Sequence, residues 1–120
     1  MLVIDDEKAI LAAYHGLLIH SPIDVDFACN FKEAVTLLSE RNYNVVISDL
    51  RLSNNVSLDG LEILNLAKKT NPAIGFILVT ACGSLDIRNR ALDMGASYFL
   101  EKPVPLSDLR KLLLQMGVEL

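Results

Sequence analysis

With 120 residues, the chain has the usual length of one domain. A hydrophobic content of 52% and a charged content of 22% exclude intrinsic disorder, and the apolar runs are far shorter than the roughly 20 residues that cross a bilayer. The formal net charge of -4 argues against direct binding of nucleic acid or of a membrane by this domain.

Apolar segments with a strand-like period alternate with helix-like segments along the whole chain. Five strands are predicted, at residues 2–4, 24–28, 44–48, 74–79 and 98–100. A helix is predicted after each strand, at about residues 10–18, 31–38, 59–69, 85–94 and 106–116. This strict alternation predicts an α/β fold with a doubly wound parallel sheet.

The ends of the helices carry recognisable signals. Asn30 and Ser84 can cap the second and fourth helices, because their short polar side chains accept a hydrogen bond from the first helical turn. Pro22 and Pro72 follow the first and third helices and stop them. Gly95 suits the left-handed residue that often follows a helix, which places the end of the fourth helix just before it.

Polar side chains follow four of the predicted strands, where the chain leaves the sheet. Asp5 and Asp6 follow the first strand, Asp49 the third, Thr80 the fourth and Lys102 the fifth. In an open parallel sheet, the loops at the carboxyl ends of the strands converge on one crevice. We therefore expect these five side chains to lie together.

Three carboxylates in one crevice repel one another unless a cation neutralises them. An open set of oxygen ligands suits Mg2+ (or Mn2+), which takes one or two protein carboxylates and fills its other positions with water and phosphate oxygens. Lys102 adds a positive charge, and Thr80 a hydroxyl donor, for phosphoryl oxygens. The pattern therefore predicts phosphoryl transfer to a carboxylate.

These residues stand in motifs that resemble the receiver domain of two-component response regulators, the CheY-like superfamily, over essentially the whole chain. The matching motifs are Val3-Ile4-Asp5-Asp6-Glu7, Ile47-Ser48-Asp49-Leu50-Arg51-Leu52, Asp59-Gly60, Val79-Thr80-Ala81 and Gly95-Ala96-Ser97-Tyr98-Phe99-Leu100-Glu101-Lys102-Pro103. The resemblance implies a flavodoxin-like (βα)5 fold with strand order 2-1-3-4-5, in which residues 1–120 form a single receiver domain.

The resemblance also implies roles around a metal ion. Asp49 matches the phosphoacceptor of the family, and Asp6 matches the direct metal ligand. Asp5 matches the acid that orients metal-bound water. The backbone carbonyl of Arg51 falls where the family supplies a further protein oxygen to the metal.

A second set of roles concerns the response to phosphorylation. Thr80 resembles the switch hydroxyl that moves onto the phosphoryl group, and Lys102 the cation that pairs with it. Phe99 matches the switch aromatic, in a form without a hydroxyl. Pro103 matches the proline whose preceding peptide bond is usually cis.

Two departures from the family pattern stand out. Ser53 takes the place of a common proline, and the stretch from Ser53 to Leu58 is about three residues longer than the usual connection. Arg51 and Cys82 lie where the family tunes the lifetime of the phosphorylated state.

The function implied is a phosphoacceptor switch. Asp49 would take a phosphoryl group from a sensor histidine kinase or a histidine phosphotransfer protein, and the surface of the fourth helix, fifth strand and last helix would then control an output domain or effector protein, or a phosphorylation-dependent homodimer. Such a domain is not an enzyme for other substrates, since it catalyses only its own phosphorylation and dephosphorylation. The cytoplasm is the expected location, and two cysteines without metal-ligand spacing favour a reducing compartment.

Three other classes of protein compete with this interpretation. Small phosphatases pair their phosphorylated aspartate with a second aspartate two positions later, where this chain has Arg51. A flavin-binding domain of the same topology would hold phosphate after the first strand, where Asp5-Asp6-Glu7 would repel it. A pseudo-receiver that binds proteins without phosphorylation remains the alternative, although the presence of all five key side chains argues against it.

Overall fold

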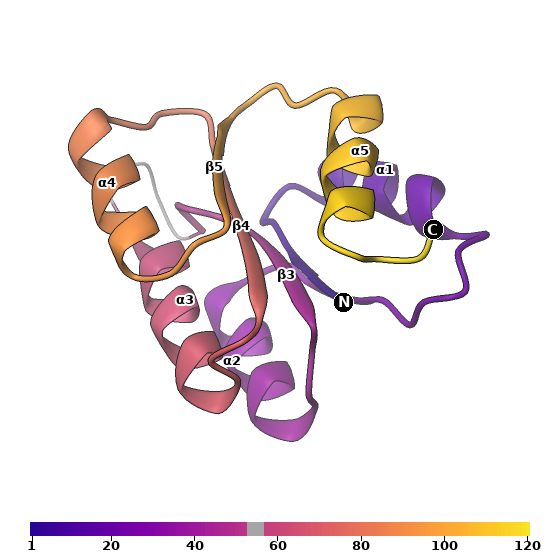
Figure 1. Cartoon of the computed structure of the whole chain (residues 1–120), viewed down its shortest axis with the longest axis horizontal. Helices are drawn as coiled ribbons and strands as arrows, with labels where there is room; N and C mark the ends of the chain where they lie inside the picture. The colour runs from indigo at the N-terminus through magenta and orange to yellow at the C-terminus, as the bar shows by residue number, and fades with distance from the viewer. Residues whose placement is uncertain (53–56) are drawn as a thin grey trace.

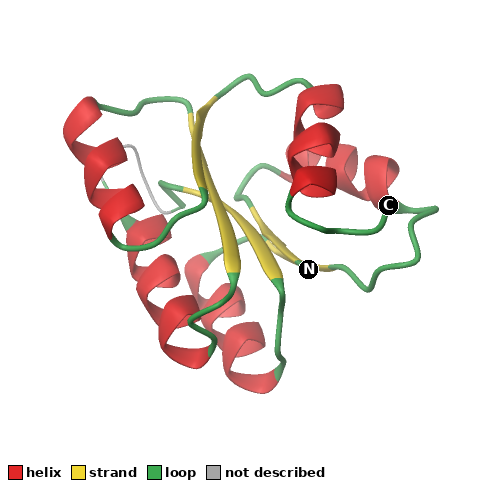
Figure 2. Ribbon diagram, viewed as in Figure 1, coloured by secondary structure: helices red, strands yellow, loops and turns green. Residues whose placement is uncertain are grey.

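The computed structural model describes residues 1–52 and 57–120, which form a parallel sheet with helices on both faces (Figure 1, Figure 2). The strands are β1 (Leu2–Ile4), β2 (Asp26–Ala28), β3 (Val45–Asp49), β4 (Gly75–Thr80) and β5 (Tyr98–Glu101). The helices are α1 (Lys8–Leu18), α2 (Phe31–Glu40), α3 (Asp59–Thr70), α4 (Leu85–Asp93) and α5 (Leu106–Gln115). The strand order β2-β1-β3-β4-β5 confirms the predicted topology.

Helices cover both faces of the sheet and bury a separate core on each. In Figure 1, α2, α3 and α4 lie on one side of the strands and α1 and α5 on the other. Val46 and Phe76 belong to the core on the α2–α3–α4 side, while their neighbours Ile47 and Ile77 belong to the core on the α1–α5 side. Because alternate residues of these strands face opposite cores, their sequences are continuously apolar.

The predicted caps of α2 and α4 and the left-handed glycine after α4 are confirmed, while α1 begins at Lys8, two residues before the predicted start. The side chain of Asn30 accepts a hydrogen bond from the amide of Glu33 at 2.8 Å, and that of Ser84 accepts one from the amide of Ile87 at 3.2 Å. Gly95 has a φ of +103°, the left-handed conformation that glycine adopts without strain. These local signals fix where α2 begins and where α4 begins and ends.

The second strand is shorter than the predicted 24–28. It begins at Asp26 because Asp26 pairs with Leu2, the first residue of β1, so the residues before it have no strand beside them. The terminal ammonium of Met1 instead donates to the carbonyl of Asp24 at 2.8 Å. The third strand is shifted by one residue from the predicted 44–48, since β3 runs from Val45 to Asp49, and Asp49 pairs with Val79 on β4.

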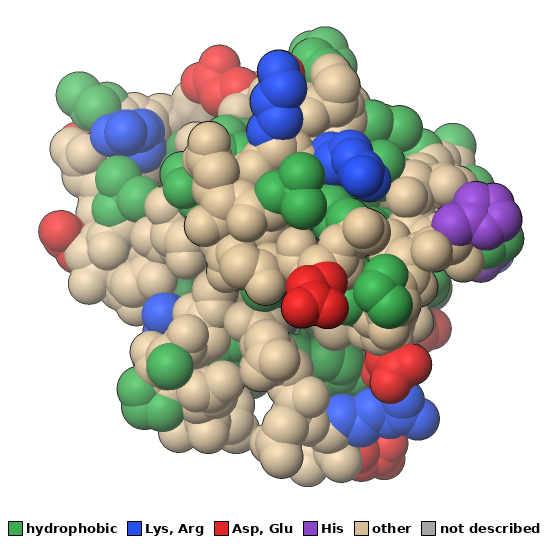
Figure 3. Space-filling view, turned by 45° about the vertical axis from the view of Figure 1, so that its right-hand side comes forward, with side chains coloured by type: hydrophobic (Ala, Val, Ile, Leu, Met, Phe, Trp, Pro, Cys, Tyr) green, Lys and Arg blue, Asp and Glu red, His purple; other side chains and the backbone are tan. Residues whose placement is uncertain are grey.

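One face of the molecule carries a mixture of side-chain types. On the face shown in Figure 3, basic, acidic and hydrophobic side chains are interspersed, and no basic patch gathers there. Among residues 1–52 and 57–120, none of the helices has both the length and the apolar character needed to span a membrane.

Candidate functional site

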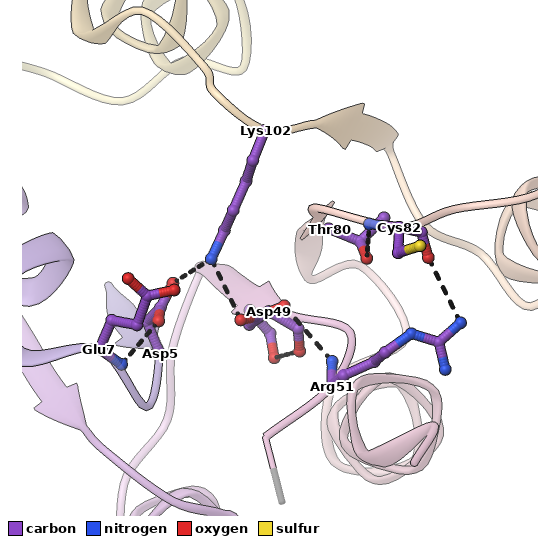
Figure 4. Close-up of polar contacts among 8 residues, drawn as sticks. Asp5, Glu7, Asp49, Arg51, Thr80, Cys82 and Lys102 are labelled. Carbon is purple, nitrogen blue, oxygen red and sulfur yellow. Dashed lines mark hydrogen bonds and ion pairs between the residues drawn. The ribbon is translucent and has the colours of Figure 1, made fainter. Parts of the chain in front are cut away.

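The carboxyl edge of the sheet brings the predicted site residues together (Figure 4). Asp49 and Thr80 are the last residues of the adjacent strands β3 and β4, and Asp5 follows β1 directly. Lys102 follows β5, and its amide donates to the carbonyl of Thr80 at 2.8 Å. The parallel register therefore places residues from four distant segments around one crevice.

Lys102 connects two carboxylates at the centre of this crevice. Its Nζ donates to Asp5 Oδ2 at 2.9 Å and to Asp49 Oδ2 at 3.1 Å. The three side chains are largely withdrawn from water, with exposed fractions of 16% for Lys102, 5% for Asp5 and 9% for Asp49. Asp5 Oδ1 also accepts the amide of Glu7 at 2.9 Å, so the local turn fixes this carboxylate.

Burial and charge shift the pKa values of the groups in the crevice. Desolvation raises the pKa of Asp49 above its ordinary value, although the ammonium of Lys102 opposes the rise. Burial lowers the pKa of Lys102, but the hydrogen bond to Asp5 and the charge of Asp49 outweigh it, and the net shift is upward. Tyr14, on α1, has its pKa raised to about 12 by burial and by the charge of Asp5. Lys102 therefore stays charged at neutral pH.

The carboxylates also form a cluster that can hold a metal ion. One oxygen from each of Asp5, Asp6 and Asp49 lies within 4.8 Å of the others. Asp5 and Asp49 are buried while Asp6 is exposed, so the cluster is open to solvent on one side. Oxygen-only ligands with an open side fit a hard divalent cation that keeps water or phosphate in its remaining positions.

Thr80 is buried beside this cluster, and its hydroxyl is bonded within its own turn. The Oγ1 atom accepts a hydrogen bond from the amide of Cys82 at 3.1 Å. Within the described residues, no hydrogen bond joins the Thr80 side chain to Asp49. The hydroxyl predicted to meet a phosphoryl group is therefore turned toward the loop that follows β4.

Phe99 lies in β5, and Pro103 follows the strand directly after Lys102. The ring of Phe99 is half-buried against the core on the α2–α3–α4 side and lies close to Gly83, where an added Cβ would approach the ring to 2.9 Å. It also lines a hollow of about 400 Å³ between the start of α4 and β5. The peptide bond between Lys102 and Pro103 is cis, which confirms that prediction.

The side-chain contacts of Arg51 were not predicted from the sequence. The position was expected to tune the lifetime of the phosphorylated state and the backbone carbonyl to bind the metal, and the structure adds that the guanidinium donates to the carbonyls of Ser57 at 3.2 Å and Cys82 at 3.3 Å. Its amide donates to Asp49 Oδ1 at 3.3 Å, which places the residue at the edge of the crevice. The position two residues after Asp49 was the available signal. The predicted lengthening of the loop from Ser53 lies largely outside the described residues.

The family model for the response regulator receiver domain matches residues 1–114. The response regulator protein PilR of Pseudomonas aeruginosa is 35% identical over 111 residues, which cover 92% of this chain and 24% of PilR. A receiver domain structure from Clostridium thermocellum is 33% identical with a TM-score of 0.82, covering 96% of this chain and 90% of that one. A Burkholderia pseudomallei response regulator was solved with a phosphorylated aspartic acid, calcium ion and citrate. It is 26% identical with a TM-score of 0.79, and the match covers 91% of this chain and 62% of that one.

The fold and the crevice are thus those of a signalling domain of the two-component type. The chain belongs to the response regulator receiver domain family. It spans about a quarter of the length of PilR, the regulator described above.

Proposed function

We propose that this receiver domain is a phosphoacceptor switch, in which Asp49 takes a phosphoryl group from a sensor histidine kinase or a histidine phosphotransfer protein in the presence of Mg2+. The observation that carries the proposal is a buried carboxylate at the end of β3, bonded to Lys102 and clustered with the acids of the β1 loop. The phosphorylated aspartic acid and calcium ion in the Burkholderia pseudomallei relative support it.

The chemistry assigns one task to each side chain. A carboxylate oxygen of Asp49 attacks phosphorus, the bond from phosphorus to the donor imidazole breaks with its electron pair going to nitrogen, and a new bond joins phosphorus to Asp49. Lys102, 3.1 Å from Asp49, offsets the negative charge of the phosphoryl oxygens. Asp6, Asp49 and the carbonyl of Arg51 would hold Mg2+ or Mn2+, with Asp5 orienting water beside it, and the ion would supply further charge neutralisation.

The switch follows from the hydroxyl of Thr80 and the ring of Phe99. A phosphoryl group on Asp49 offers new acceptor oxygens, and Thr80 leaves the amide of Cys82 to reach them. Phe99 then turns toward the space that Thr80 vacates, and the hollow beside α4 changes shape. The new hydrogen bond of Thr80 at the end of β4 in this way changes the shape of the surface beside α4.

The responding surface consists of α4, β5 and α5. It carries exposed large hydrophobic side chains, at Leu85 on α4 and at Leu106 and Leu114 on α5, of which Leu85 is 69% exposed. Such side chains suit contact with a protein, either an output domain or effector or a second copy of the chain on phosphorylation. The domain works in the cytoplasm and transforms no substrate other than itself and its phosphoryl donor.

Intact-mass measurement after incubation with acetyl phosphate tests this function. The wild-type chain is expected to gain one phosphoryl group in the presence of Mg2+ and none when the metal is chelated. The Asp49→Asn variant is expected to gain none, whereas Asp93→Asn, which alters an exposed carboxylate at the end of α4, should behave as wild type.

Two outcomes would contradict the assignment. Full labelling of Asp49→Asn would place the phosphoryl group elsewhere. An unlabelled wild-type chain under every condition would favour the phosphorylation-independent protein-binding module.

A further inference from the structure

The guanidinium of Arg51 joins two loops at the rim of the crevice. Nη1 donates to the carbonyl of Ser57, before α3, at 3.2 Å, and Nη2 donates to the carbonyl of Cys82, after β4, at 3.3 Å. Figure 4 shows the side chain reaching from the end of β3 across to the loop that carries Cys82. Arg51 therefore ties the loop after β4 to the opposite rim of the site.

Both backbone polar groups of Cys82, its carbonyl and its amide, form hydrogen bonds. Its carbonyl accepts from Arg51, and its amide donates to Thr80 Oγ1 at 3.1 Å. The Arg51 side chain thus holds the same short turn that engages the Thr80 hydroxyl. Movement of the Thr80 hydroxyl toward Asp49 has to break its hydrogen bond with the Cys82 amide. Because Arg51 holds the turn in place, Arg51 opposes this movement.

We propose that the Arg51 side chain is a latch that keeps the turn from Thr80 to Cys82 in its present conformation and so restrains the Thr80 hydroxyl from reaching a phosphoryl group on Asp49. The proposal rests on the phosphoacceptor function proposed above and adds a regulating residue to it. Arg51 acts through Cys82 and is a positioning residue.

The geometry indicates a latch that opens readily. Both bonds are long for charge-assisted hydrogen bonds and end on carbonyl oxygens instead of carboxylates. Among the described residues only Nη1 and Nη2 of the guanidinium find acceptors, while Nε has none. The latch therefore biases the resting state without locking it.

Binding of beryllofluoride, which occupies the place of the phosphoryl group, measures this restraint in the whole chain. The apparent affinity of a ligand falls with the fraction of protein in the competent conformation. Arg51→Met keeps the length of the stem and the backbone carbonyl but removes both donors. It is expected to bind beryllofluoride about fivefold more tightly than wild type with Mg2+ present, the effect of losing one modest net hydrogen bond.

Two comparisons separate the latch from other effects of Arg51. In a Thr80→Val background the hydroxyl is absent, so Arg51→Met should leave the affinity unchanged. Lys32→Met removes an equal charge from an exposed position on α2, outside the site and the responding surface, and should also leave it unchanged.

A second measurement needs no ligand. Hydrogen exchange at the Cys82 amide of the unphosphorylated chain should be several-fold faster in Arg51→Met than in wild type, because the turn that pairs this amide with Thr80 is released.

Unchanged or weaker beryllofluoride binding by Arg51→Met would overturn the latch, and so would an equal gain in the Thr80→Val background. Unchanged exchange at Cys82 would overturn it as well. Failure of the wild-type chain itself to bind beryllofluoride or to be phosphorylated would instead overturn the phosphoacceptor function and the latch together.

Discussion

Gly60 offers the sharpest test of how the fold positions Asp49. This second residue of α3 is buried against the end of β3, and an added Cβ would lie 2.6 Å from the carbonyl oxygen of Asp49 and 2.7 Å from the Cα of Leu50. Both are backbone atoms, which cannot rotate away. The amide of Gly60 also donates to the carbonyl of Leu50 at 2.9 Å, so displacement of the helix weakens that bond.

Gly60→Ala should therefore destabilise the protein. Overpacking a filled site costs about 1–3 kcal/mol, and contact with rigid backbone puts Gly60 at the upper end. Loss of the bond to Leu50 adds about 1 kcal/mol, which the better helix propensity of alanine offsets. We expect the free energy of unfolding to fall by about 3 kcal/mol, as measured by urea denaturation.

Gly16→Ala is the matched control. Gly16 lies inside α1 with no atom within 4 Å of an added Cβ, so alanine should raise the free energy of unfolding by about 0.5–1 kcal/mol. The two variants differ only in the surroundings of the same added methyl group. A loss of less than about 1 kcal/mol in Gly60→Ala would refute the inferred close approach, since adaptation of the backbone would then be easy.

Three further predictions concern the crevice and a helix cap. Burial raises the pKa of Asp49 in the folded state, so the folded state binds a proton more readily than the unfolded chain. The free energy of unfolding of wild type, relative to Asp49→Asn, should therefore rise as the pH falls through that raised pKa, and the opposite trend in urea melts would contradict this. Lys102→Met leaves two largely buried carboxylates without their cation and should cost about 3 kcal/mol at neutral pH, which equal midpoints with wild type would exclude. Asn30→Ala removes the α2 cap and should cost about 1 kcal/mol; an unchanged thermal midpoint would argue against the cap.

Much of the fold was predictable because its signals are local. The continuous apolar run of β3 indicated a strand covered on both faces, and Asp49 at its end was expected in the crevice. The capping role of Asn30 and the positive φ of Gly95 depend on side-chain size and polarity within one turn. Strand-end positions converge in any parallel sheet, so the meeting of distant acids with Lys102 also followed from topology.

Other contacts left no readable pattern. The bond from Arg51 to the carbonyl of Cys82 joins a side chain to a backbone oxygen 31 residues away, and backbone carbonyls are present at every position. The short β2 depends on where β1 begins to pair, which periodicity within residues 24–28 does not reveal. Lys102 donates hydrogen bonds to Asp5 as well as to Asp49. This double contact depends on the conformation of the lysine side chain, which the sequence does not reveal.

The separation of the core by the sheet has a consequence for protein engineering. Residues such as Ile47 and Ile77 pack only with the α1–α5 side, while the ring of Phe99 packs with the other side. A chimera that takes α1, α5 and the strand residues facing them from a relative would replace one half of the interior as a matched set. The half that contains Phe99 would keep its native packing, so the two cores can be exchanged independently of each other.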